Sequence, residues 1–346
     1  MTPWTQQVTL APSPYIRRHL HHLCLLNRPP CSLSPFIVET GESPRDFLHD
    51  CSLTPFSTAK QQERQQRLDA LPASFSESCT EQDHKIIDLS LRELVRRREA
   101  GTLSVSTILQ AYGKKVVSAQ KATNCLALVM LQESTVSEPP RSSPRSEHKS
   151  DTHEATRPLS GVLVSIKDCI DIKGFDTTVG YSSRVNKPAV SSAAIVRLLQ
   201  DAGAIIHAKT TTPPGLIGLE TTSDLFGRTC NPYNDKFVSG ASTGGGAALL
   251  ASRGSLIEIG TDIGGSVRWP AHCCGIYGMR SSIGRFPSLG TMPPLPGQEF
   301  VGTSCSPMAR RLDDLEEFWK RVVDMKPWNY DHTVRQCRLP RMRSKP

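Results

Sequence analysis

The chain has 346 residues, 38% of them hydrophobic and 21% charged, so it is long enough for one large domain with a sizeable core or for two smaller ones. No apolar run approaches the ~20 residues of a membrane span, so we expect no transmembrane segment. The net charge of +8 resides at the two ends, because residues 1–38 and 335–346 carry basic side chains and no acidic ones. A nucleic-acid groove would carry that excess on the folded surface, so we expect no nucleic-acid partner.

The eleven cysteines are scattered, without a Cys-x-x-Cys pair or the Cys/His spacing of a zinc site. This pattern is typical of reduced thiols in an intracellular protein, so we expect a cytoplasmic location and no metal. The first 38 residues are free of acids and contain arginine, which also resembles a transit peptide. A mitochondrial location therefore stays open.

The first 85 residues are rich in proline and serine near their start, and we expect a poorly ordered extension there with one charged helix near Ala59–Leu71. A helix is predicted over Ser90–Ala100, because Ser90 begins a capping box and apolar residues follow at helical spacing. A second helix begins near Ser104. Residues 86–133 therefore read as an N-terminal helical hairpin.

Residues 134–160 contain Ser, Pro, Glu and Arg with almost no large aliphatic side chain, which predicts a disordered insertion. From residue 161 strands alternate with helices, which predicts an α/β core over 161–332 with a mixed sheet and helices on both faces. The predicted elements are the strands Val162–Ile166, Ala204–Ala208 and Leu256–Ile259 and the helices Ser192–Ala202, Ala247–Ser252 and Asp313–Val323. Residues 333–346 form a basic tail.

Three segments carry chemically active side chains: Lys167 at the end of an apolar strand, GASTGGG at 240–246 and GTDIGGSVR at 260–268. Taken singly, each has an ordinary explanation. A lysine beyond a strand end is usually solvated, and Ser242 or Ser266 would serve as a helix cap. Asp262 and Arg268 would likewise form a structural ion pair.

Taken together, the three segments suit amide hydrolysis, which needs a nucleophile, a base that returns its proton to the leaving amine, and donors for the oxyanion. Ser266 follows glycine-rich peptides whose backbone N–H groups are unobstructed. A buried Lys167 would be neutral near pH 7, because burial disfavours its charged form. Ser242 would relay the proton between that amine and Ser266.

These motifs, in this order and spacing, resemble the amidase signature family, and most closely its eukaryotic branch of acetamidases and fatty-acid-amide hydrolases. The resemblance covers about Ile86–Asp331 and implies the amidase-signature fold. It also implies that an amide is hydrolysed through an acyl-enzyme by a Ser–Ser–Lys triad. Lys167 would be the general base, Ser242 the bridging serine after a cis peptide, and Ser266 the acylated nucleophile.

The resemblance further assigns the substrate-binding groups. The backbone N–H groups of Ile263, Gly264, Gly265 and Ser266 match the oxyanion hole, and Leu216 matches a position that lines the acyl pocket. A small-molecule amide is the expected substrate, with no cofactor, and a homodimer stays open.

Two features depart from the family pattern. The bridging turn reads Gly-Ala-Ser-Thr instead of Gly-Gly-Ser-Ser, which keeps the hydroxyl of Ser242. Family members also continue well beyond Trp328, so we expect a truncated chain with an exposed apolar face and low solubility or lost activity.

Two alternatives remain open. One is a catalytically impaired remnant or interaction protein. The other is a serine esterase, because residues 240–244 also match the Gly-x-Ser-x-Gly nucleophile elbow. Mapping the adduct of a fluorophosphonate probe discriminates these functions.

Overall fold

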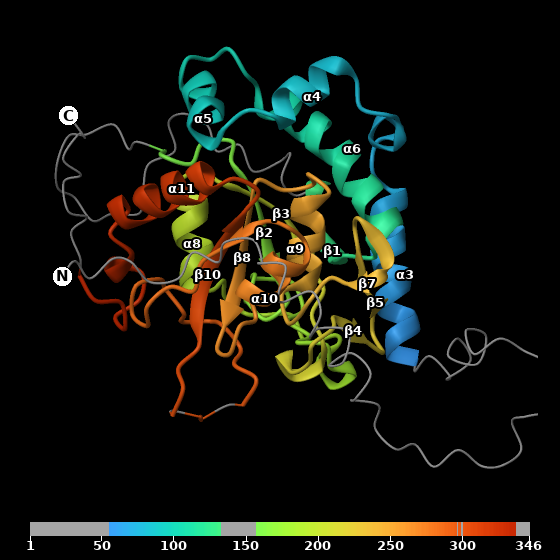
Figure 1. Cartoon of the computed structure of the whole chain (residues 1–346), viewed down its shortest axis with the longest axis vertical. Coiled ribbons are helices and arrows are strands. Elements are labelled where there is room, and N and C mark those ends of the chain that lie inside the picture. The colour runs from blue at the N-terminus through green and yellow to red at the C-terminus, as the bar shows by residue number, and fades with distance from the viewer. Residues whose placement is uncertain (1–54, 133–156, 296, 299, 337–346) are drawn as a thin grey trace, which may run out of the picture.

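Six strands form a mixed sheet at the centre of the part that our computed structural model describes, residues 55–132, 157–295, 297–298 and 300–336 (Figure 1). Their order across the sheet is β1-β3-β2-β8-β10-β9. The three central strands β3, β2 and β8 are parallel, and the outer neighbours pair antiparallel. The strands are β1 (Leu126–Val129), β2 (Leu163–Lys167), β3 (Ile205–Thr210), β8 (Ile257–Asp262), β9 (Tyr277–Gly278) and β10 (Ser304–Ala309).

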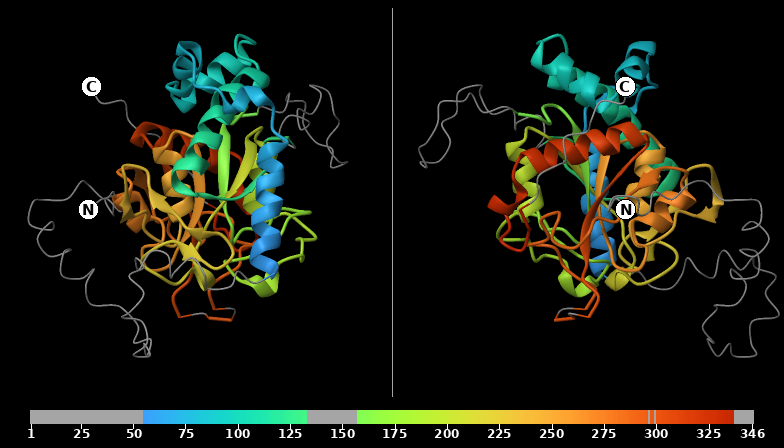
Figure 2. Two further views of the ribbon diagram at one scale, coloured as in Figure 1. Left: turned by 90° about the vertical axis from the view of Figure 1, so that its right-hand side faces the viewer. Right: turned by 60° about the vertical axis from the view of Figure 1, so that its left-hand side comes forward.

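Helices cover both faces of this sheet, which confirms the predicted fold class (Figures 1 and 2). Helix α8 (Ala194–Asp201) lies between β2 and β3, and α9 (Gly244–Ala251) lies between β3 and β8. These two crossovers step across the sheet in opposite directions, so right-handed connections place the helices on opposite faces. Helix α11 (Leu312–Asp324) lies on the side of α8, where Phe318 is fully buried.

Strand β10 was not predicted from the sequence. Its six residues include two serines and Pro307, and proline is unusual in the interior of a sheet because it donates no hydrogen bond to a neighbour. The strand nevertheless pairs with β8 over its whole length, from Ser304 opposite Asp262 to Ala309 opposite Ile257. Its burial between two strands, which only the tertiary structure shows, outweighs its weak local preference.

Helix α9 begins earlier than predicted, at Gly244 rather than Ala247. Gly244, Gly245 and Gly246 therefore belong to the helix, and all three are fully enclosed by neighbouring atoms. A side chain at any of them would overlap residues of the strands or of the adjoining turns. The glycines thus allow the first turn of α9 to approach the sheet closely.

The predicted N-terminal helices are confirmed, with additions. A charged helix was predicted and is observed, and the structure adds an unpredicted short helix in front of the hairpin. The four helices are α3 (Pro55–Asp69), α4 (Glu81–Ile87), α5 (Leu91–Glu99) and α6 (Val105–Thr123). Ser90 and Ser104 cap the hairpin helices by accepting hydrogen bonds from the N–H groups of Glu93 and Thr107.

Three predicted boundaries differ from the structure. Residues 55–85 are folded rather than poorly ordered, because α3 packs against β1 and Arg64 donates a 2.7 Å hydrogen bond to the carbonyl of Leu126. The predicted insertion ends before Leu159, which is fully buried. The predicted tail is part of the body through Val334, which is buried. Most of the extension (1–54), of the insertion (134–156) and of the tail (337–346) lies outside the described residues.

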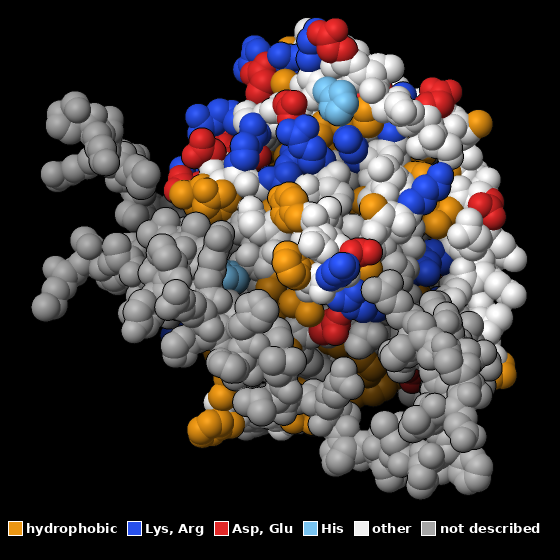
Figure 3. Space-filling model, turned by 45° about the vertical axis from the view of Figure 1, so that its right-hand side comes forward, with side chains coloured by type: hydrophobic (Ala, Val, Ile, Leu, Met, Phe, Trp, Pro, Cys, Tyr) orange, Lys and Arg blue, Asp and Glu red, His pale blue; other side chains and the backbone are white. Residues whose placement is uncertain are grey.

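The remaining elements are short. They are β4 (Thr222–Ser223), β5 (Gly227–Arg228), β6 (Cys230–Asn231), β7 (Asn234–Val238) and α10 (Arg268–Cys273), with short 3-10 turns at Ala73–Ser76, Ser182–Arg184, Pro214–Leu216 and Pro327–Asn329. On the face shown in Figure 3, charged side chains of both signs gather over the upper half. Within the described ranges, every helix is too short or too polar to cross a bilayer.

Candidate active site

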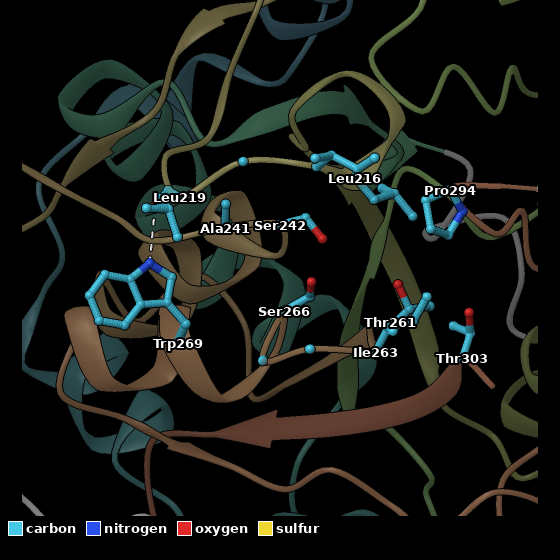
Figure 4. A pocket seen from close by; sticks show the side chains of 14 residues that line it. Leu216, Leu219, Ala241, Ser242, Thr261, Ile263, Ser266, Trp269, Pro294 and Thr303 are labelled. Carbon is cyan, nitrogen blue, oxygen red and sulfur yellow. Dashed lines mark hydrogen bonds between the residues drawn. The ribbon is translucent and has the colours of Figure 1, made fainter. Parts of the chain in front are cut away.

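The three predicted functional side chains come from segments that meet at one edge of the sheet; Figure 4 shows two of them, Ser242 and Ser266. Lys167 is the last residue of β2, and Ser242 lies in the turn that leads into α9. Ser266 lies in the turn between β8 and α10. The carboxyl ends of the parallel strands β2 and β8 point to the same edge, which is where open α/β sheets place their ligand sites.

Lys167 is fully buried and its Nζ lies 2.6 Å from Ser242 Oγ, in hydrogen-bond contact. The same amine donates to Thr261 Oγ1 at 3.0 Å and to the Thr261 carbonyl at 3.3 Å. Burial lowers the pKa of Lys167, since the ammonium form loses its hydration. Lys167 is therefore a buried amine held against a serine hydroxyl, not the solvated side chain of the ordinary explanation.

Ser242 is also fully buried, and the peptide between Ala241 and Ser242 is cis. Its turn is tied to the turn of Ser266, because the N–H of Thr243 donates a 3.1 Å hydrogen bond to the Ser266 carbonyl. This bond fixes the two serine-bearing turns relative to each other.

Ser266 is half-buried, and its hydroxyl points toward the same space as that of Ser242 (Figure 4). Within the described part of the chain, the Ser266 hydroxyl has no hydrogen-bond partner. The structure thus brings Lys167 and Ser242 into direct contact and places Ser266 beside them without a bond between the two serine hydroxyls.

Asp262 organises the turn that carries Ser266. Its carboxylate accepts hydrogen bonds from the N–H groups of Gly265 at 2.8 Å and Val267 at 3.1 Å. It also forms ion pairs with Arg268 at 3.1 Å and Arg280 at 3.5 Å. Burial opposes the charge of Asp262, but these donors outweigh it and lower the pKa of the carboxyl group. The structural ion pair of Asp262 and Arg268 is therefore present, and it holds the turn that carries Ser266.

One predicted oxyanion donor needs correction. Gly265 already donates its N–H to the carboxylate of Asp262 at 2.8 Å. The N–H groups of Ile263, Gly264 and Ser266 have no acceptor among the described residues. These three are the donors available to a bound carbonyl oxygen.

A cavity of about 480 Å³ opens above the serines. Its walls include Leu216, as predicted, together with Leu219, Trp269 and Pro294, which the sequence did not single out. The indole N–H of Trp269 donates a 3.0 Å hydrogen bond to the Leu219 carbonyl and joins α10 to the neighbouring loop (Figure 4). The cavity is thus apolar on its sides and polar at its floor, as expected for a small-molecule site.

Two further sets of polar contacts were missed. Thr261 holds the amine of Lys167 with both its hydroxyl and its carbonyl, and the position of Thr261 inside GTDIGGSVR was the available signal. Lys209 and Asp168, the residue that follows Lys167, form a fully buried ion pair at 2.9 Å. No local pattern pointed to Lys209, because its partner lies 41 residues earlier in another strand connection.

The nucleophile-elbow alternative lacks its structural context. Ser242 is not preceded by a buried strand, because β7 is a largely exposed part of a two-stranded hairpin. Its hydroxyl contacts a lysine rather than a histidine. His207 binds the carbonyls of Val164 and Gly254, and the ring of His272 stacks on Trp269.

One comparison with known proteins establishes the family: the family profile described as "Amidase" matches residues 107–345. The chain belongs to the amidase family. The match extends beyond the predicted limit at Asp331 and includes most of the basic tail, which we had predicted to be unlike the family. Within the described residues, no group of three or more His, Cys, Asp or Glu side chains is arranged to hold a metal ion.

Individual relatives of the chain agree with that family assignment. The chain is 34% identical over 255 residues to an acetamidase of Emericella nidulans and 33% identical over 266 residues to a probable amidase of Saccharomyces cerevisiae. These matches cover 74% and 75% of this chain but 46% of each relative. The chain therefore spans about half the length of the curated relatives it matches.

Among solved structures, a fatty acid amide hydrolase superposes with a TM-score of 0.76 at 28% identity. The superposition covers 87% of this chain and 56% of the hydrolase. The chain thus shares the fold of that hydrolase over the superposed portion.

Proposed function

We propose that this chain carries the catalytic centre of an amidase that hydrolyses a carboxylic amide to a carboxylate and ammonia or an amine. Ser266 is the nucleophile, Ser242 relays the proton and Lys167 is the general base. The observation that carries the proposal is the 2.6 Å contact between the buried amine of Lys167 and Ser242, at the floor of a cavity that Ser266 also lines.

The contacts of Lys167 suit a neutral amine. Such an amine has two N–H groups and one lone pair, and the hydroxyl and carbonyl of Thr261 accept two hydrogen bonds from it. The lone pair is then left for the hydroxyl proton of Ser242. The lowered pKa of Lys167 supports this arrangement, because it favours the form that accepts a proton.

The reaction proceeds by proton transfer along this line. Ser242 passes its proton to Lys167 and takes the proton of Ser266, whose Oγ then attacks the amide carbon. The Ser266 hydroxyl has no competing partner in the described chain, so it is free to turn toward Ser242. As the C–N bond breaks, the proton returns through Ser242 to the leaving nitrogen, and water then hydrolyses the Ser266 ester.

The oxyanion of each tetrahedral intermediate is accepted by the backbone N–H groups of Ile263, Gly264 and Ser266. A backbone donor fixed before the reaction stabilises this charge without reorganisation. Asp262 holds the turn so that these donors face the cavity. The side chains and backbone supply every proton and donor that the steps require, so the proposal includes no metal or organic cofactor.

The substrate is a small linear amide with an apolar acyl group. Leu216, Leu219 and Trp269 provide the apolar walls that would contact that group. The names of the relatives, acetamidase and fatty acid amide hydrolase, support the amide class, and their different acyl groups leave the length of the chain to be measured.

A fluorophosphonate probe tests the proposal, because it phosphonylates an activated serine irrespective of the acyl group. We expect a single adduct on Ser266, abolished in Ser266→Ala and strongly slowed in Ser242→Ala. Thr243→Ser is the matched control, since it changes a hydroxyl residue in the same turn and leaves all three proposed groups in place. An adduct on Ser242 would favour the esterase, and a folded chain without adduct would favour an impaired remnant.

A further inference from the structure

A buried carboxyl group lies close to the proposed base. Glu258 belongs to β8 and is fully buried. It stands opposite Ser165 of β2, two residues before Lys167. Side chains two apart on a strand point to the same face, so Glu258 and Lys167 share the face that α9 covers.

The room for this carboxyl group is provided by Gly246. A Cβ at that position would overlap the carboxyl carbon and Oε1 of Glu258. Oε1 accepts a 2.7 Å hydrogen bond from Thr210 Oγ1, while Oε2 has no hydrogen-bond partner among the described residues. Thr210 is in turn the residue of β3 that stands opposite Lys167. Glu258 is therefore held at a defined place but incompletely satisfied.

The charges around Lys167 single out this carboxyl group. The ionisable groups that face the amine are Cys169, Asp262, Glu258 and Cys305. Burial raises the pKa of both cysteine thiols, which keeps them neutral. Asp262 is neutralised by Arg268 and Arg280. Glu258 alone among the four is an acid without a cation of its own, and Lys167 is the one cation that acts on it in the described chain.

We propose that Glu258 is a positioning residue for Lys167: its buried carboxyl group, held by Thr210 above Gly246, sets how strongly the lysine amine holds a proton. The proposal rests on the proposed role of Lys167 as general base. Glu258 touches neither the cavity nor the serines, so it acts through Lys167. An ionised Glu258 stabilises the ammonium form, which makes the amine a stronger base.

The pKa of Glu258 indicates the pH range in which its charge would act on Lys167. Burial raises it to about 7, against the hydroxyls of Ser165 and Thr210 and the charge of Lys167, which lower it. The carboxyl group therefore changes its charge near neutral pH, where the amine is proposed to work, and the two groups titrate as a coupled pair. The charge of Glu258 also acts on the thiol of Cys125, but burial raises the pKa of this thiol to about 12, so the thiol stays neutral.

The test is the pH dependence of fluorophosphonate labelling in Glu258→Gln, which keeps the shape and removes the charge. Labelling requires neutral Lys167, so its rate rises with pH through the pKa of the lysine. We expect the midpoint of this rise to move to lower pH by on the order of one unit. The plateau rate should also fall several-fold, because the amine is a weaker base. Glu316→Gln, the same change on the exposed side of α11, is the control and should leave the midpoint in place.

A second pair of variants tests the same proposal in case Glu258→Gln does not fold. Thr210→Val removes the hydrogen bond to Glu258 and should move the midpoint in the same direction, while Thr210→Ser retains the hydroxyl and should restore it. A midpoint that stays at the wild-type pH in both Glu258→Gln and Thr210→Val overturns the proposal.

The lysine can also be titrated without any turnover. In protein labelled with ¹³C at lysine Cε, the Lys167 signal is assigned by its loss in Lys167→Met, and its pKa is expected to fall in Glu258→Gln. A wild-type chain that does not label refutes the proposed function, but the NMR titration still decides the role of Glu258. Equal Lys167 pKa values in wild type and Glu258→Gln overturn that role.

Discussion

Replacing Lys167 by methionine separates catalysis from stability at this site. Methionine is apolar and of similar length, so it fills the buried space and removes the proton acceptor. General-base catalysis contributes about 100- to 10,000-fold. This corresponds to roughly 3–5.5 kcal/mol of the barrier for acylation. We therefore expect Lys167→Met to label with fluorophosphonate at least 100-fold more slowly than wild type.

The stability of the same variant should not fall in proportion. Burial lowers the pKa of Lys167 in the folded state, so below about pH 10 the unfolded chain binds the extra proton and folding is penalised. Each unit of pKa depression costs about 1.4 kcal/mol. This penalty is largest below the folded-state pKa and disappears as the pH rises to the ordinary value. Lys167→Met removes it, which offsets the lost hydrogen bonds to Ser242 and Thr261.

The assay combines pseudo-first-order labelling rates with urea unfolding at pH 6, 7.5 and 9. We expect the free energy of unfolding of Lys167→Met relative to wild type to be most favourable at pH 6 and least favourable at pH 9. Labelling at the wild-type rate would refute Lys167 as the base. A stability difference that is independent of pH would refute the depressed pKa.

Two other predictions concern parts of the fold that support the site. Asp262→Asn should destabilise the chain by about 3 kcal/mol, because it breaks a buried ion pair. This value is at the lower end of the usual range, since Arg268 and Arg280 are about one-quarter exposed. Urea unfolding measures the change, and an unchanged midpoint would contradict the prediction. His207 has a pKa lowered to about 4 by burial, so the unfolded chain binds more protons between about pH 6.5 and 4 and stability should fall by roughly 3 kcal/mol across that window. Urea unfolding of His207→Asn beside wild type checks this, since the variant should lose that part of the acid dependence.

The sequence predicted the parts of this molecule that are encoded locally. Short apolar runs and caps identified the central strands and the hairpin helices, and the glycine-rich motifs identified the segments that carry Lys167, Ser242 and Ser266. Their order along the chain was enough to predict that they converge. The contact between Lys167 and Ser242 agrees with that prediction, while the catalytic roles remain to be tested.

The features that were missed depend on contacts between distant segments. Strand β10 has weak local preference and is stabilised by the strands on both sides. The hydrogen bond from Gly265 to Asp262 depends on how the turn folds back on that carboxylate, which the motif does not specify. From the sequence, Glu258 is only a polar residue inside a predicted strand. The structure shows that the absence of a side chain at Gly246 leaves space for its carboxyl group.

The hydrogen bond from Trp269 to the Leu219 carbonyl has a consequence for how substrate range could change. It is a solvent-exposed link between a loop and a short helix, whereas Lys167 belongs to the sheet and Ser242 and Ser266 lie in turns that a hydrogen bond ties together. Substitutions in the cavity walls would therefore change the shape of the cavity while the reacting groups keep their positions. Selection for a new acyl group would act first on the residues around Trp269, and the chemistry would be inherited unchanged.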